Sequence, residues 1–251
     1  MTDKSEVAQV AQVTLRFYGR RKSHKLRQHQ QELYDSLLPR LTLRLDDAGA
    51  NGATRSDLAA QFAMGGHETQ ANGTTYRDFW LEIGFGGGEH MVGQARAHPD
   101  IGVIGCDMFL NGLAQALRHI DEAKIANIRL VEGDARHLLS LLPDQSLGRV
   151  YILFPDPWPK KRHHRRRIIN QSLLDQVARV LRPGSDLRLA TDDLSYLSAM
   201  LSATLRHREF NWQARRAVDW RTPPAEWVPT RYQKKAERAG RRPYFLNFTR
   251  V

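Results

Sequence analysis

The feature that most constrains the fold is a series of short apolar segments that alternates with helical patterns from residue 79 onward. The apolar or β-branched segments span 79–83, 101–106, 128–131, 150–154 and 187–190. Strands that alternate with helices form a parallel sheet, because each parallel connection needs a long crossover. The sequence therefore predicts an α/β fold: a doubly wound, mostly parallel sheet with helices on both faces, closed by strands within 210–214 and 247–249.

The segment before residue 79 shows no such pattern. Residues 46–78 are rich in Gly, Asn, Thr and Ala without a sustained period, and we interpret them as mostly loop. Neither a repeat nor an obvious linker divides the rest of the chain. We therefore expect a basic arm with a loop-rich extension over 1–78 and a single domain over 79–251.

Charge is unevenly distributed along the 251 residues, whose formal net charge is +11. Segments 16–27, 160–167 and 206–250 together carry +20, so the remaining residues sum to −9. One basic run alone is compatible with a solvated face, and a helical pattern over 165–181 allows arginines simply to cover a helix N-terminus. Three runs on an acidic body instead indicate a nucleic-acid surface.

Composition and spacing exclude several other classes. No apolar run reaches the roughly 18 to 20 residues of a membrane span, and the N-terminus lacks a signal-peptide pattern. The single cysteine, Cys106, forms no internal disulfide, and no Cys/His cluster has zinc-ligand spacing. We therefore expect a cytoplasmic protein that uses neither membrane nor metal; a monomer and a homodimer are both compatible with the sequence.

A glycine-rich loop, EIGFGGGEH over residues 82–90, follows the first predicted strand. Gly84, Gly86 and Gly88 let the backbone approach a nucleotide at the carboxyl end of that strand. Glu89 stands where a dinucleotide fold carries its third glycine, and the GK[ST] of a P-loop is absent. The spacing is similar to the first motif of Rossmann-like S-adenosylmethionine methyltransferases, whose cofactor has no phosphate.

Acidic residues stand at or near the ends of three successive predicted strands. Each alone is commonly a surface residue or helix cap, but their recurrence favours a cofactor pocket. Asp107 lies 21 residues beyond Gly86, where a carboxylate accepts hydrogen bonds from both ribose hydroxyls. Asp134 is suited to accept the adenine amino group, and Glu82 to face a positively charged methionine end.

The most informative stretch is LFPDPWPKKRH over 153–163. Prolines on both sides of Asp156 stiffen the loop and fix the direction of its carboxylate. Taken alone, the stretch also fits a proline-punctuated turn with an exposed basic tail. Together with IGFG (83–86) and ATDD (190–193), it resembles the bacterial tRNA (guanine-N7-)-methyltransferase family, which has a Rossmann-like class I fold.

The resemblance covers about residues 16–40 and 79–251. It implies transfer of a methyl group from S-adenosyl-L-methionine to N7 of a guanine in the variable loop of tRNA. Asp156 would be the catalytic residue and also a cofactor contact. The other implied cofactor contacts are Glu82, Gly84, Gly86, Gly88, Asp107 and Asp134. The implied substrate contacts are Lys160, Asp192, Thr230, Arg231, Tyr232 and Gln233.

The chain departs from the family pattern at two of these positions. Asp107 stands where the family usually has glutamate, and its shorter carboxylate remains serviceable. Gln233 replaces the glutamate of a T-x-[FY]-E segment, so a charge-assisted contact becomes a neutral one of about half the strength. The 46–78 segment also looks longer than the usual connection.

The implied chemistry needs no general base, because guanine N7 carries an exposed lone pair in the ring plane. The attacked ring becomes cationic, and we expect Asp156 to stabilise that charge and hold the guanine edge rather than abstract a proton. Trp158 and Tyr232 are candidates for stacking on a flipped base, although packing is the commoner role of an aromatic beside a proline turn.

Two other functions are compatible with these residues. A different nucleic-acid methyltransferase would place the proline-flanked acid on an exocyclic amine. An RNA-binding protein that retains the cofactor fold without turnover is slightly favoured by Gln233. A nicotinamide-dependent dehydrogenase is disfavoured by Glu89 in the third glycine position.

Overall fold

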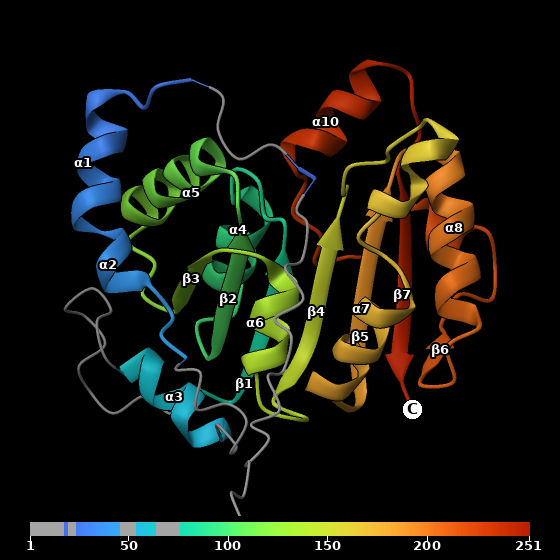
Figure 1. Cartoon of the computed structure of the whole chain (residues 1–251), viewed down its shortest axis with the longest axis horizontal. Coiled ribbons are helices and arrows are strands. Elements are labelled where there is room, and N and C mark those ends of the chain that lie inside the picture. The colour runs from blue at the N-terminus through green and yellow to red at the C-terminus, as the bar shows by residue number, and fades with distance from the viewer. Residues whose placement is uncertain (1–17, 20–23, 46–53, 64–75) are drawn as a thin grey trace, which may run out of the picture.

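The computed structural model describes residues 18–19, 24–45, 54–63 and 76–251, which form an α/β structure around a seven-stranded sheet (Figure 1). The strands are β1 (Asp78–Ile83), β2 (Ile101–Asp107), β3 (Ile128–Glu132), β4 (Leu147–Leu153), β5 (Leu181–Thr191), β6 (Phe210–Trp212) and β7 (Tyr244–Arg250). The helices are α1 (Gln28–Ser36), α2 (Leu38–Leu41), α3 (Arg55–Ala63), α4 (Glu89–Ala97), α5 (Leu110–Ala123), α6 (Ala135–Leu141), α7 (Gln171–Val180), α8 (Leu194–Leu205), α9 (Val218–Arg221) and α10 (Arg231–Arg238).

The sheet has the order β3-β2-β1-β4-β5-β7-β6. Strands β1 to β5 are parallel, and β7 runs antiparallel to both β5 and β6. The order reverses between β1 and β4, which makes the sheet doubly wound and opens a crevice at the carboxyl ends of these strands. The predicted α/β class, its parallel strands and its closing pair are confirmed.

Alternating side chains of the strands divide the core into two layers. In β1, Phe79 and Leu81 belong to the cluster that α6, α7 and α8 cover, whereas Trp80 belongs to the cluster beneath α4 and α5. Helices α1 and α2 extend this second cluster through residues such as Leu41. Both faces of the sheet are therefore covered, so its strands read as nearly continuous apolar runs.

The prediction that 46–78 is mostly loop is wrong at α3, which lies within it. Arg129, on β3, is 1% exposed and donates from Nε to the Gln61 carbonyl and from Nη2 to the Phe62 carbonyl, at 2.8 Å each. These carbonyls belong to the last turn of α3, where helical partners are missing, so Arg129 caps the helix. Arg129 thus stabilises α3 from a distant strand, and the local sequence of α3 does not predict the helix.

The described part of the N-terminal extension is attached to the sheet. Outside the described residues lie 1–17, 20–23, 46–53 and 64–75, which include much of the predicted basic arm. The backbone N–H of Leu43 donates to the Leu130 carbonyl at 2.9 Å, and the Tyr34 hydroxyl donates to Glu132 at 2.6 Å. The domain division at residue 78 stays a prediction.

The predicted helix over 165–181 is wrong at its start. A 3-10 helix spans Lys161–Arg166, and α7 begins only at Gln171. The Asn170 side chain accepts a hydrogen bond from the Leu173 N–H at 3.1 Å and so caps α7. The arginines of the basic run therefore precede α7 and lie beside the loop that follows β4.

Candidate active site

The predicted site residues gather where the parallel strands end. In register, Ile83 of β1 lies beside Cys106 of β2 and Ile152 of β4, so the loops after these strands meet at one edge. The glycine loop, Asp107 and the loop that carries Asp156 all emerge there. The carboxyl edge of the sheet therefore brings together motifs that are far apart in the sequence.

The glycine loop needs glycine for its conformation. Gly84, Gly86 and Gly88 have φ values of +72°, +56° and +77°, in the left-handed region that other residues rarely adopt. A Cβ built at Gly84 would meet nothing within 4 Å, so open space adjoins the backbone there. The chain can therefore receive a ligand against the end of β1.

Asp107 is tied to this loop through both carboxylate oxygens. The Gly86 N–H donates to Oδ2 at 2.8 Å, and the Phe109 N–H donates to Oδ1 at 2.8 Å. Burial raises the pKa of Asp107, while these backbone hydrogen bonds lower it in part. Each oxygen keeps a further lone pair, so the carboxylate can also accept a pair of hydroxyl groups.

Glu82 is more enclosed than the sequence indicates. Its side chain is 2% exposed and lies 2.7 Å from His90 Nδ1, and His90 is 1% exposed. The His90 ring contacts Tyr151 and Trp227, with centroids 4.7 and 5.0 Å apart. Within the described part of the chain, His90 Nε2 has no hydrogen-bond partner. His90 therefore fixes the Glu82 carboxylate, a role that no spacing in the sequence indicated.

Asp134 is the N-cap of α6. It accepts from the Arg136 N–H at 2.9 Å and forms an ion pair with the Arg136 guanidinium at 2.5 Å. Burial opposes ionisation of Asp134, yet the hydrogen bonds from Arg136 lower its pKa below the ordinary value. The helix-cap role that the sequence left open is therefore present, and any contact with an adenine amino group would use the remaining lone pairs.

The loop around Asp156 is anchored by a buried arginine, Arg167. Asp156 itself is exposed, and the loop is bounded by Phe154 and Trp158, whose φ values are +49° and +47°. Arg167 is 6% exposed and donates from Nε to the Pro157 carbonyl at 2.9 Å. Its Nη2 donates to Ser195 Oγ at 3.0 Å, which links the loop to α8. The sequence alone does not reveal this anchor, because Arg167 ends a run of basic residues.

For the methyl transfer to tRNA that the sequence resemblance implies, substitution of Arg167 by methionine is expected to lower kcat roughly ten-fold, because small displacements of a catalytic group are costly. The KM for tRNA should change less than two-fold, since Arg167 is buried. Arg162→Met, at an exposed position in the same run, should leave kcat unchanged. Steady-state kinetics on both variants, with melting temperatures compared, would refute the anchor if the two kcat values agreed.

The two candidate stacking residues differ in their surroundings. The Arg166 guanidinium lies over the Trp158 ring at 4.9 Å from its centroid and over Tyr18 at 5.0 Å. His163 meets the Trp158 ring edge-on at 6.0 Å. Trp158 therefore packs within the basic run, whereas Tyr232 is 43% exposed at the crevice.

The segment before and within α10 lies directly on the glycine loop. A Cβ at Gly86 would come within 2.9 Å of the Tyr232 ring. Arg231 Nε donates to Glu89 at 2.7 Å, across the loop. Burial raises the pKa of Tyr232, and the negative charges of Asp107 and Asp156 raise it further. Tyr232 therefore lies against the glycine loop and interacts electrostatically with Asp156 in the loop after β4.

Thr230 and Gln233 hold the start of α10 together. Thr230 Oγ1 accepts from the Gln233 N–H at 3.0 Å, which caps the helix. Gln233 is 5% exposed; its Oε1 accepts from Trp227 Nε1 at 2.5 Å, and its Nε2 donates to Glu237 at 2.9 Å. An amide serves here because Gln233 must donate to one neighbour and accept from the other. Its predicted contact with substrate is untested.

The remaining predicted substrate residues flank the crevice. Lys160 is exposed after β4. Asp192 follows β5 and accepts from Arg241 Nε at 2.6 Å. Both lie in loops at the carboxyl edge, so the structure brings them to the same side of the sheet as Asp156.

Within residues 18–19, 24–45, 54–63 and 76–251, no cluster of three or more His, Cys, Asp and Glu side chains is arranged to bind a metal ion. The helices of the same ranges are too short or too polar to cross a membrane. Three carboxylates beside open glycine backbone supply hydrogen-bond acceptors and negative charge, which fits a cofactor with hydroxyl, amino and cationic groups.

Known proteins share this sequence and fold. A family model described as a putative methyltransferase matches residues 77–246. The tRNA (guanine-N(7)-)-methyltransferase of Rhodospirillum rubrum is 48% identical over 94% of this chain and 88% of that protein. The enzyme of the same name from Nitrobacter hamburgensis is 46% identical over 93% and 86%. The solved aminoglycoside resistance methyltransferase NpmB1 has a TM-score of 0.51 at 19% identity, covering 79% of this chain and 94% of that one, and supports the fold alone.

A doubly wound sheet with a glycine loop after β1 and an acid that ends β2 is a Rossmann-like cofactor fold, and the family model identifies it as a methyltransferase of the S-adenosylmethionine type. Sequence identity of 46–48% with the two bacterial relatives, over nearly the whole chain, identifies the family within this class. The chain belongs to the tRNA (guanine-N7-)-methyltransferase family.

Proposed function

We propose that this protein transfers a methyl group from S-adenosylmethionine to N7 of a guanine in the variable loop of tRNA, in the cytoplasm. The observation that carries the proposal is the meeting of Asp107, Asp156 and Tyr232 at one edge of the sheet, beside an exposed basic run. The names of relatives that are 46–48% identical support the same reaction.

Cofactor binding is assigned to the end of β1 and the two acids that follow in the sheet. Asp107 would hold the ribose, Asp134 the adenine amino group and Glu82 the methionine end. When bound, S-adenosylmethionine supplies an electrophilic methyl group on a positively charged sulfur. His90 would hold the Glu82 carboxylate in one orientation inside the domain, because the 2.7 Å contact is made between two fully buried side chains.

Asp156 acts on the guanine. Because N7 has its own lone pair, no residue must remove a proton before attack. The exposed carboxylate would hold the N1–H and amino edge of the base and stabilise positive charge as it develops on the ring. The flanking prolines and Arg167 fix its direction, so orientation supplies much of the rate enhancement.

Substrate binding is assigned to the residues that border Asp156. Tyr232 offers an exposed ring on which a flipped guanine can stack, at a typical gain of about 1–3 kcal/mol per base. Lys160 and the basic run would contact phosphates. Asp192, Thr230 and Arg231 would shape the rim of the site, since they lie in the adjoining loops and at the start of α10.

The proposal is tested by incubating the full chain with methyl-labelled S-adenosylmethionine and tRNA, then digesting the tRNA and identifying the labelled nucleoside. We expect N7-methylguanosine, and only when the variable loop contains a guanine. Label on an exocyclic amine would indicate a different methyltransferase. Binding of tRNA without label would indicate an RNA-binding protein.

Charge reversal at Arg165 is expected to weaken tRNA binding and to flatten its salt dependence by about one to two units of slope. Arg165 is exposed, whereas Arg166 is held between two aromatic rings and is a less specific probe. Lys124→Glu, outside the basic segments, is the matched control. Affinities measured for Arg165→Glu that equal those of the control at two salt concentrations would contradict a phosphate role.

A further inference from the structure

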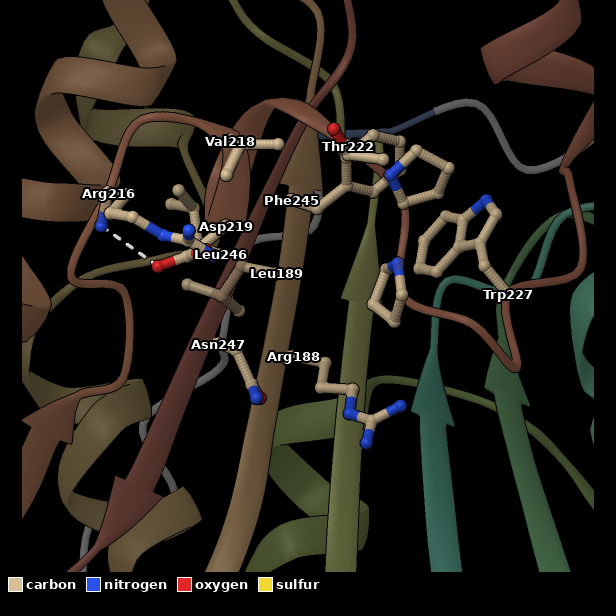
Figure 2. A pocket seen from close by; sticks show the side chains of 12 residues that line it. Arg188, Leu189, Arg216, Val218, Asp219, Thr222, Trp227, Phe245, Leu246 and Asn247 are labelled. Atoms are coloured by element: carbon tan, nitrogen blue, oxygen red, sulfur yellow. Dashed lines mark hydrogen bonds and ion pairs between the residues drawn. The ribbon is translucent and has the colours of Figure 1, made fainter.

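A pocket of about 350 Å³ lies on the sheet over β5 and β7, away from the crevice. Figure 2 shows Arg188 and Asn247 on its floor, with Trp227 on one side and Arg216 on the other. The floor comes from Arg188 and Leu189 near the end of β5 and from the first half of the antiparallel β7, and the segment that includes α9 forms the opposite wall. None of the predicted site residues lines this pocket.

The floor carries one hydrogen-bond donor and one acceptor without partners. Arg188 and Asn247 are registered neighbours across β5 and β7, so their side chains extend from the same face. Arg188 Nη2 is engaged by Asp186 at 3.1 Å, but its Nε is buried without a partner among the described residues. The same holds for Asn247 Oδ1. Buried polar atoms of this kind normally have partners, so the pair calls for a ligand or water.

The walls of the pocket are flat and apolar, while its rim carries an ion pair. Phe245, Trp227 and the Pro223-Pro224 step supply the walls. Arg216 is 79% exposed at the rim; its guanidinium pairs with Asp219 at 3.5 Å, and its backbone N–H donates to the same carboxylate at 2.8 Å. A flat ring with an acceptor beside a donor fits the interior.

We propose that this pocket binds a second nucleobase of the tRNA, one with a carbonyl beside a ring N–H, as in uracil or guanine. The proposal rests on tRNA as the substrate, and the base is not the methylated one. Arg188 precedes Asp192 by four residues, which places the floor roughly 13 Å along β5 from the carboxyl edge. A base seated there would hold the tRNA in register while another guanine enters the crevice.

Trp227 connects the two sites. Its ring contacts His90, and its indole N–H donates to Gln233 in α10, the helix that lies on the glycine loop. A base against Trp227 would therefore also steady the start of α10 and Tyr232. The pocket thus serves positioning of the substrate, not chemistry.

The test compares tRNA dissociation constants at several salt concentrations. Val218→Trp fills the pocket from an exposed wall position, and Asn247→Leu removes the acceptor. Leu205→Trp, an exposed apolar residue outside the lining, is the control. We expect both pocket variants to bind about ten-fold more weakly with an unchanged salt slope, because a base contact releases no counterions. The control should match wild type.

Affinities of Val218→Trp equal to that of the control would overturn the proposal and leave only ordered water in the pocket. If the variants do not fold, the proposal is tested on wild-type protein crosslinked to tRNA that contains 4-thiouridine or 6-thioguanosine, and the crosslinked residues are identified. A crosslink to Trp227 or Phe245 supports the pocket, and none at either overturns it. Wild-type protein that binds tRNA but forms no N7-methylguanosine would refute the proposed function alone.

Discussion

Asp156→Asn is expected to lower kcat for methyl transfer to tRNA by roughly 100- to 1000-fold, the usual effect of removing one group that stabilises transition-state charge. Asparagine keeps the shape of the side chain but lacks the negative charge that would face the cationic guanine. The residue is exposed, so the substitution should leave the melting temperature unchanged. Dissociation constants for tRNA should change less than three-fold.

The matched control for Asp156 is Asp144→Asn, which removes an exposed carboxylate from the opposite edge of the sheet, before β4. It should retain full activity. Single-turnover rates at saturating tRNA and cofactor measure the effect without interference from product release. Full turnover by Asp156→Asn with normal tRNA binding would refute the charge-stabilising role.

Asp107→Ala is expected to weaken S-adenosylmethionine binding at least 100-fold. The carboxylate would provide two charge-assisted hydrogen bonds to the ribose, each worth about 1.5–3 kcal/mol. Its removal also frees Gly86 N–H, which Asp107 holds at 2.8 Å, so the glycine loop loses an anchor. Calorimetric titration of the full chain with the cofactor measures the loss directly.

Glu132→Gln is the control for Asp107, because Glu132 ends the next strand and pairs in register with Asp107. It should bind the cofactor within two-fold of wild type. Since burial raises the pKa of Asp107, its ionised form is lost at a higher pH than that of an ordinary aspartate. Affinity that depends on this group should therefore fall as pH drops, and Asp107→Ala should lack that dependence. Equal affinities for the alanine variant and wild type would contradict the assignment.

The sheet could be predicted from sequence because its strands are local apolar runs between helical patterns. The sequence predicts the first strand over 79–83, which is one residue shorter than β1 in the structure. Helix α3 could not be predicted, because its C-terminal cap is the side chain of Arg129, more than sixty residues away. The break before α7 depends likewise on Asn170 and on Arg167, which turns toward Pro157.

The acidic residues of the candidate site could be predicted from the sequence, but the hydrogen bonds and ion pairs around the site could not. Glycine spacing and the strand ends are local features of the sequence and indicate Asp107, and the flanking prolines are local features that indicate Asp156. The Glu82–His90 pair and the contact between Arg231 and Glu89 join separate segments, so their partners follow only from the three-dimensional arrangement. Gln233 illustrates the same limit: its departure from the family pattern is explained by Trp227 and Glu237 as neighbours.

The most direct test of the account replaces the variable-loop guanine of a substrate tRNA by 7-deazaguanine, which has a C–H group in place of N7. The Watson–Crick edge that Asp156 would hold is unchanged, so the tRNA should bind with normal affinity. We predict methyl transfer to the guanine-containing tRNA and none to the 7-deaza form. Equal methylation of both would show that N7 is not the acceptor and would contradict the proposed reaction.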